Sequence, residues 1–337
     1  MDRRLRAGRG TNLALLVLLA SALLTGALAF ANGGRWTFVT LAAHGAAGLG
    51  IVLLAPWKSV ISRRGVRRGR PGTVASISLA VLIVITVGTG VAHAVGMWPS
   101  VLAIQIHVGA ALCSIPLAIW HVVARPVRPR RTDVSRRSLL RAGAVAAGSV
   151  AAFAALEGSV RVSGFAGAER RATGSYERGS FDPDAMPVTQ WLDDTPPAVG
   201  STDWRLEVRT PTGVRTFTYE QIASFDDAVR ATLDCTGGWF ATQDWKGVRL
   251  DRLLGRDADV RSVVVVSSTG FSRRFPIDDA PSIVLATRVG GEPLAVGHGF
   301  PARLVVPGRR GFWWVKWVER VEASSTPWWW QSPFPLT

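Results

Sequence analysis

The sequence predicts a chain of two parts. The first is an α-helical membrane bundle of four helices plus a fifth signal or anchor helix, and the second is an α+β domain. Of the 337 residues, 48% are hydrophobic, and in the first half they gather into long apolar runs. From about residue 176 the pattern changes to short alternating apolar segments separated by Gly-, Pro- and Asp-rich turns, which is typical of strands.

Four apolar runs each have the length that a helix needs to cross a hydrocarbon core about 30 Å thick, which is roughly 20 residues. They cover residues 11–31, 36–57, 73–98 and 101–124. We therefore expect residues 1–124 to form a four-helix transmembrane domain.

Charge is distributed unevenly along the chain, which carries a formal net charge of +15. Residues 1–141 hold 18 of the 39 basic residues but only 2 of the 24 acidic ones. The basic residues cluster before the first run, after the second and after the fourth, whereas the turns near Asn32 and Gly96 carry only Arg35. This positive-inside pattern predicts a multi-pass protein of the cytoplasmic membrane with a cytoplasmic N-terminus. Because the rest of the chain is nearly neutral, the charge does not indicate nucleic-acid binding.

Residues 125–165 begin as a Pro- and Arg-rich linker. They continue through Ser135-Arg136-Arg137 into a mildly apolar run that ends near Leu156. Two arginines before such a run resemble a twin-arginine export signal placed inside the chain, and we expect its helix to be kept as an anchor. The alternative is an ordinary basic loop before a fifth spanning helix. Both interpretations place residues 176–337 outside the cytoplasm.

Four histidines lie within the apolar runs: His44, His93, His107 and His121. Ionisable residues in membrane helices indicate function, and neutral imidazole is an axial ligand of haem iron. Counting about 1.5 Å per residue places the first three toward the outer leaflet, where His107 would face His44 or His93. His121 lies roughly 21 Å further in on the same helix face, without a partner at its depth. We expect one haem b, with all four as candidate ligands; the alternatives are an interfacial His121 and a haem-free anchor.

The second half presents a single cysteine at the end of a strand-like segment, residues 231–233. Cys235 enters a Thr-Gly-Gly-Trp turn, where Gly237 and Gly238 lack a Cβ and let a bulky ligand approach the backbone. A thiolate suits a metal already held by sulfur. A lone cysteine in a strand is more often a small buried hydrophobic residue, so this interpretation depends on the surrounding motifs. For Cys113, in an apolar run, we expect helix packing and no disulfide.

Further motifs follow in order along the chain. They are Trp245-Lys246-Gly247-Val248 with Leu253-Leu254, the Gly-Glu-Pro-Leu turn at 291–294, His298-Gly299-Phe300-Pro301-Ala302-Arg303, and Val315-Lys316-Trp317. Together with the cysteine turn, they resemble the sulfite oxidase family of molybdopterin enzymes over residues 176–325.

This resemblance implies a sulfite-oxidase-like α+β domain over residues 176–337 that binds a molybdenum cofactor. It implies that Cys235 is the catalytic residue and ligates molybdenum. The remaining cofactor-binding residues that it implies are Gly237, Gly238, His298, Arg303 and Lys316. An arginine fork matches a phosphate in two hydrogen bonds, which fits Arg303.

The pattern of alternation also predicts individual elements of this domain. Strands are expected at residues 204–208, 261–266, 304–306 and 314–321, and short helices at 219–224 and 250–254. A domain of about 160 residues is large enough to bury its own core.

The implied function is a membrane-anchored oxidoreductase that performs two-electron oxo transfer on a small substrate. It would exchange electrons with membrane haem and with quinone or a respiratory partner. Such a cofactor is inserted in the cytoplasm, so the domain must be exported folded, which favours the twin-arginine interpretation. The alternative function is a non-catalytic electron carrier or binding protein that kept the fold.

The chain departs from the family pattern directly after the metal cysteine. Sulfite-oxidising members place an arginine pair there, whereas this chain has Gly237 to Phe240. A pocket walled by Trp239 and Phe240 suits sulfite poorly, so we expect neutral sulfoxide-like or organic substrates at least as readily. Positive charge from other loops would have to come from Arg273, Arg274, Arg309 or Arg310.

Overall fold

The computed structural model describes residues 8–34, 36–67, 72–127, 130, 133, 135–191, 194–195, 197, 200–255 and 259–334. The chain divides into two compact units. The helical unit holds Met1–Phe30 and Arg35–Tyr176, and the sheet unit holds Ala31–Gly34 and Glu177–Thr337. The basic residues of the first seven positions, Arg35, residues 68–70 and part of the 125–133 linker lie outside the described residues.

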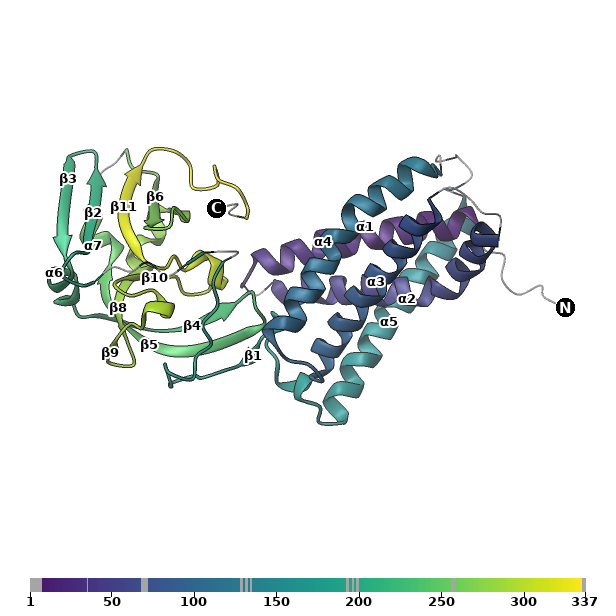
Figure 1. Ribbon diagram of the computed structural model, residues 1–337, viewed down its shortest axis with the longest axis horizontal. Coiled ribbons are helices and arrows are strands. Elements are labelled where there is room, and N and C mark those ends of the chain that lie inside the picture. Colours follow the sequence, from purple (N-terminus) through teal and green to yellow (C-terminus); the bar gives the residue numbers. More distant parts are fainter. Residues whose placement is uncertain are drawn as a thin grey trace. The chain divides into compact units, whose positions relative to one another are not determined.

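Five long helices make up most of the helical unit (Figure 1). They are α1 (Arg9–Ala31), α2 (Thr37–Arg67), α3 (Thr73–Val95), α4 (Val101–Ala124) and α5 (Arg136–Val162), followed by the 3-10 turn η2 (Ala166–Glu169). By length and composition, all five helices could cross a membrane. The four predicted runs thus coincide with α1 to α4, although α2 continues about three turns beyond Trp57. The Ser135 side chain caps α5 by accepting the Ser138 backbone N–H.

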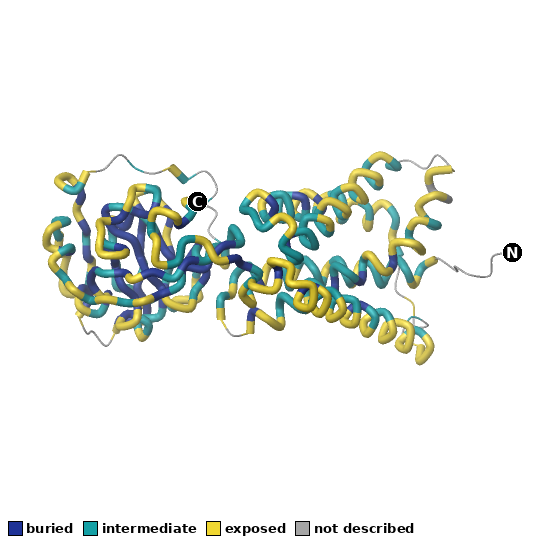
Figure 2. The backbone as a smooth tube through the Cα atoms, turned by 90° about the horizontal axis from the view of Figure 1, so that it is seen from below, coloured by how far each residue is buried: buried dark blue, intermediate teal, exposed yellow. Residues whose placement is uncertain are grey.

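Apolar side chains cover the outside of these helices. α3 packs against α4 and α2 against α5, but most helical residues stay exposed or half-buried (Figure 2). Val74 and Val84, for example, are 78% and 70% exposed. A helix that is apolar all round requires an apolar environment, which fits lipid contact for these faces.

The sheet unit contains two sheets. The first has the order β1-β5-β8-β10, with β4 paired to β5 and β9 to β8. Its strands are β1 (Tyr176–Glu177), β4 (Asp227–Cys235), β5 (Trp239–Arg249), β8 (Val284–Val289), β9 (Glu292–Pro293) and β10 (Arg303–Val305). β8 is buried along almost its whole length, as expected for a strand covered on both faces.

The second sheet has the order β3-β2-β11-β6-β7, in which only β11 and β2 run parallel. Its strands are β2 (Arg205–Thr210), β3 (Gly213–Thr218), β6 (Ser262–Ser267), β7 (Ser272–Pro276) and β11 (Val318–Ser324). Short helices α6 (Tyr219–Ala223) and α7 (Leu250–Leu254) and the 3-10 turns η3 (Ile277–Ser282), η4 (Val296–His298) and η5 (Gly311–Trp313) connect the strands.

Most of the predicted elements of the sheet unit are present, but the prediction of a strand at 314–321 is wrong in its first half. Gly311–Trp313 form η5, and Trp317 adopts a left-handed backbone with φ 50°. A bulky residue there interrupts a strand, so β11 begins only at Val318. The alternating sequence alone gave no indication of this break.

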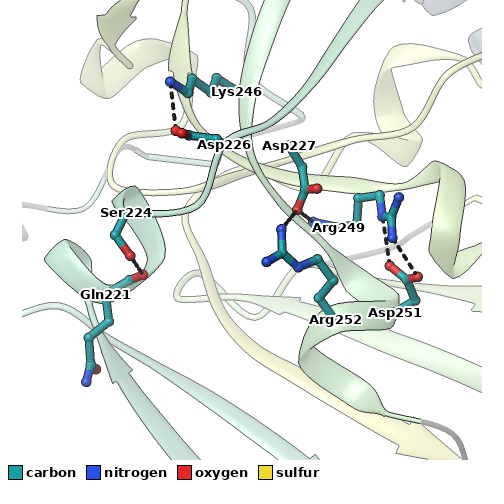
Figure 3. A network of polar contacts seen from close by, with 8 residues as sticks. All are labelled: Gln221, Ser224, Asp226, Asp227, Lys246, Arg249, Asp251 and Arg252. Atoms are coloured by element: carbon teal, nitrogen blue, oxygen red, sulfur yellow. Dashed lines mark hydrogen bonds and ion pairs between the residues drawn. The ribbon is translucent and has the colours of Figure 1, made fainter.

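The β4–β5 hairpin carries Cys235 at its closed end, where Cys235 pairs with Trp239. Its open end is tied down by Asp227. The Asp227 carboxylate accepts hydrogen bonds from the Arg249 backbone N–H (3.0 Å) and from Arg252 Nη1 in α7 (2.9 Å), as Figure 3 shows. Charge-assisted bonds of this kind fix the strand start, and hence the register that delivers Cys235.

Replacement of Asp227 by Ala removes both bonds and is expected to destabilise the sheet unit by about 1–2 kcal/mol, since hydrogen bonds to charged groups contribute on this order. The measurement is urea unfolding of the full chain followed by tryptophan fluorescence. Asp226→Ala is the matched control, because the Asp226 side chain is 80% exposed and pairs with the half-exposed Lys246 (Figure 3). Equal effects of the two substitutions would contradict the proposed anchor.

Candidate functional site

Cys235 opens into a cavity of about 630 Å³, a volume that includes its open mouth. Four segments of the sheet unit line it: Pro187, Thr189, Gln190, Trp191 and Asp194; Leu233, Cys235, Thr236 and Trp239; Ser267 and Phe271; and His298, Arg303, Gly311, Phe312, Trp314 and Lys316. The cavity therefore brings together the predicted Cys235, His298, Arg303 and Lys316.

The sulfur of Cys235 is held by two polar contacts. The Gly237 backbone N–H donates to Sγ at 3.3 Å, and Thr189 Oγ1 lies 3.3 Å from it. Gly238 has φ 83° and donates its N–H to the Cys235 carbonyl at 3.2 Å, which closes the turn. The two glycines thus shape the turn around the sulfur. Thr189 was missed from the sequence because it lies 46 residues away in a connection without periodicity.

Arg303 begins β10 and is almost fully buried. Its Nη1 donates to the His298 carbonyl at 3.1 Å, and its guanidinium lies over the rings of Trp245 and Trp314 at 5.5 and 5.7 Å. Arg303 Nε has no hydrogen-bond partner. A buried guanidinium with an unused donor requires an acceptor, and the cavity beside it can supply one.

Lys316 lies between η5 and β11 and fastens the loop before β2. Its Nζ donates to the carbonyls of Thr189 (2.9 Å) and Gly297 (2.6 Å) and to Gln190 Oε1 (2.8 Å). Gly299, with φ 109°, passes directly beside this cluster, and a Cβ there would lie 3.3 Å from the Lys316 Cβ. The His-Gly-Phe-Pro sequence therefore needs glycine at this position.

The basic groups of the cavity have strongly lowered pKa values. Burial, followed by the positive charges of Arg303 and Lys316, lowers the pKa of His298 to about 4. Burial, followed by the Arg303 charge, lowers the pKa of Lys316 to about 7. Burial also lowers the pKa of Arg303 to about 10, which leaves it charged at neutral pH. These shifts show that burying positive charge in this cavity is energetically unfavourable. A bound anion would offset that cost.

The four arginines named as possible sources of charge from other loops do not line the cavity. Arg273 lies over the Trp313 ring at 3.9 Å, Arg274 bonds Ser262 and Ser324, Arg309 pairs with Asp279, and Arg310 pairs with Asp234. Trp239 lines the cavity as expected, but the expectation for Phe240 is wrong because adjacent strand residues point to opposite faces. Trp191, Phe271 and Phe312 complete the aromatic wall instead.

In the helical unit, His44 of α2 and His107 of α4 face each other. Their ring centroids are 5.8 Å apart with planes at 80°. His44 Nδ1 lies 2.9 Å from the Ala22 carbonyl and His107 Nδ1 lies 2.7 Å from the Thr86 carbonyl. A carbonyl partner makes each Nδ1 the protonated nitrogen, which leaves a free lone pair on each Nε2.

Both contacts are built in the same way. Gly26 lies four residues after Ala22, and a Cβ there would be 3.0 Å from the His44 ring. Gly90 lies four residues after Thr86, and a Cβ there would be 2.9 Å from the His107 ring. Each glycine lets an imidazole reach the backbone of the neighbouring helix.

The other two histidines have different surroundings. His93 Nε2 lies 3.0 Å from the Gly174 carbonyl, and the Tyr176 hydroxyl donates to the His93 carbonyl. His93 therefore fastens the segment after η2 and does not face His107 as the alternative pairing required. His121 Nδ1 lies 3.2 Å from Ser76 Oγ, away from the His44–His107 pair. Cys113 lies on α4 but is exposed, so the expected packing role is wrong.

The sheet unit of the chain matches a known protein family. Residues 193–331 match the family model of the oxidoreductase molybdopterin binding domain. The NAD(P)H nitrate reductase of Hordeum vulgare is 31% identical over 166 residues, which is 37% of this chain and 19% of that protein. The inducible NADH nitrate reductase 1 of Glycine max is 33% identical over 99 residues, 24% of this chain and 11% of that protein.

Among solved structures, the sulfane dehydrogenase SoxCD of Paracoccus pantotrophus matches 39% of this chain and 40% of that chain at 27% identity, with a TM-score of 0.37. The chain spans about a fifth or less of the length of the two nitrate reductases that it matches. The family match, residues 193–331, contains Cys235 and all three basic residues of the cavity. The C-terminal part of this chain is therefore a molybdopterin oxidoreductase domain.

Proposed function

We propose that this protein is a membrane-anchored molybdenum enzyme that performs oxo transfer on a small, uncharged substrate outside the cytoplasm. The observation that carries the proposal is the convergence of one thiol and three basic side chains on a single cavity.

The residues of the cavity fit a molybdopterin cofactor. Cys235 offers a soft ligand for the metal, and the unused Nε of buried Arg303 offers a donor for the phosphate. When bound, the cofactor supplies the two-electron redox chemistry. Arg303 and His298 would hold its anionic part, Lys316 would keep the Thr189–Gln190 loop against it, and Gly237 would donate its N–H to the ligating sulfur.

The wall of the cavity supports an uncharged substrate. Trp191, Trp239, Phe271 and Phe312 are apolar, and the cations of the cavity belong to the group proposed to hold the cofactor. None of Arg273, Arg274, Arg309 and Arg310 lines the cavity. A sulfoxide-like or other neutral organic molecule thus fits better than an oxyanion such as sulfite or nitrate, which would need a free cation.

Cys235→Ser is expected to lower molybdenum content and to reduce activity by more than about 100-fold, since loss of a metal ligand costs at least as much as loss of its outer-shell partners. The measurement is metal analysis of the full-length protein together with reduced-dye assays using dimethyl sulfoxide and nitrate. Cys113→Ser is the control and should retain both properties. Absence of molybdenum from the wild type, even with cofactor biosynthesis co-expressed, would favour the non-catalytic binding protein.

The lowered pKa of Lys316 predicts that the stability of the cofactor-free protein depends on pH. Its pKa is about 7 when folded and near 10.5 when unfolded, so the unfolded chain binds one proton more between these values. The free energy of unfolding should therefore rise by about 1–2 kcal/mol as the pH rises from 6.5 to 8.5. Denaturant unfolding at both pH values measures this gain. Lys316→Met should abolish it, whereas the exposed Lys246→Met should not; an unchanged gain in Lys316→Met would refute the assignment.

The helical unit supports a haem as the electron carrier. His44 and His107 face each other with ring centroids 5.8 Å apart, and they are the two residues that would hold the haem. No group of three or more His, Cys, Asp or Glu side chains suitable for a metal occurs in the described part of the chain.

Electrons would then pass between the haem and the molybdenum domain and onward to quinone or a respiratory partner. The five apolar helices support insertion in the cytoplasmic membrane, and the basic clusters support a cytoplasmic N-terminus. Arg136 and Arg137 at the start of α5 support export of the folded domain by a twin-arginine route. A haem-free anchor is the competing proposal for the helical unit.

Full-length protein from haem-supplied cells is expected to show b-type haem bands in its reduced-minus-oxidised spectrum. His44→Ala and His107→Ala should each abolish the bands, because neither ring has a substitute at its position. His93→Ala and His121→Ala are the controls and should retain them. A wild type without haem bands would establish the haem-free anchor instead.

A further inference from the structure

We infer that the buried Asp234–Arg310 pair is a positioning device for Cys235. This inference rests on the proposed role of Cys235 as the molybdenum ligand. Arg310 Nη1 and Asp234 Oδ1 are 2.7 Å apart, and their side chains are 4% and 7% exposed. Asp234 directly precedes the cysteine, so the pair acts on the same stretch of backbone.

The guanidinium of Arg310 donates hydrogen bonds to two acceptors. While Nη1 bonds Asp234, Nη2 donates to the Cys235 carbonyl at 3.1 Å. The planar guanidinium sets the two donors at a fixed spacing, which an ammonium group cannot reproduce. The carbonyl of Cys235 is thereby held by Arg310 as well as by the Gly238 N–H.

The backbone around Arg310 reinforces this contact. Asp234 and Arg310 form an isolated parallel bridge, and Gly311 packs against the cysteine so closely that a Cβ would lie 3.1 Å from the Cys235 Cα. η5 starts at Gly311, and the Trp313 N–H donates to the Arg310 carbonyl at 2.9 Å. The η5 turn thus fixes the backbone of Arg310 next to Asp234 at the end of β4.

Stability alone does not explain the arrangement. A buried ion pair is often no more stabilising than apolar residues of similar volume, because both charges must be desolvated. The bond to the Cys235 carbonyl is what an apolar pair would lack. Groups that orient a metal ligand from behind commonly affect metal affinity and activity by about 10–100-fold.

The test separates folding from positioning by comparing single and paired substitutions in a Cys113→Ser background. Arg310→Leu and Asp234→Leu each remove the partner of a buried charge and should lower the melting temperature strongly. The double variant should recover most of the melting temperature. Its Cys235 should nevertheless react at least threefold faster with iodoacetamide in cofactor-free protein, and its sulfur-to-molybdenum absorption band should shift in loaded protein.

Two further variants serve as references. The double variant Arg230→Leu, Asp244→Leu removes an exposed ion pair from the same hairpin and should change none of these properties. Arg310→Lys should keep the pair with Asp234 and the melting temperature, but not the wild-type alkylation rate. A double Leu variant with wild-type alkylation and absorption would overturn the inference. If the wild type holds no molybdenum, the proposed function fails, whereas the alkylation experiment still decides the positioning role.

Discussion

The sheet unit depends on holding positive charge inside the protein next to a thiol. Arg303 is almost completely buried, and its neighbours Lys316 and His298 have lowered pKa values because they are buried themselves and lie near its positive charge. Such a cluster opposes folding unless an anion enters the cavity. The fold therefore contains a binding site whose occupation stabilises it, and the surrounding strands, turns and glycines keep the cations in place until the anion binds.

Some residues of the site could be predicted from the sequence and others could not. Cys235, His298, Arg303 and Lys316 stand within short runs that include glycine, proline or tryptophan, and these runs could be recognised in order along the chain. Thr189 and Arg310 act through contacts 46 and 75 residues away in sequence. Nothing local distinguishes a threonine in a connection or one of two adjacent arginines, so only the fold assigns them a role.

The same limit applies to the elements themselves. Apolar runs of about 20 residues predicted α1 to α4 because helix length follows from local composition. The strand predicted at 314–321 failed in its first half because the backbone of Trp317 is left-handed, a conformation imposed by packing. Trp239 and Phe240 also show that two adjacent aromatic residues on a strand cannot both line one cavity.

In the helical unit, depth along the helices selected three histidines but could not choose among the pairs. Two glycines distinguish the pair of histidines that the structure brings together. Gly26 and Gly90 each stand four residues after the carbonyl that bonds a histidine, and each removes the side chain that would otherwise keep the ring away. His93 has no such arrangement in its contact with Gly174 and instead fastens the chain beyond η2. The two equivalent glycine contacts thus orient His44 and His107 toward each other, with ring centroids 5.8 Å apart.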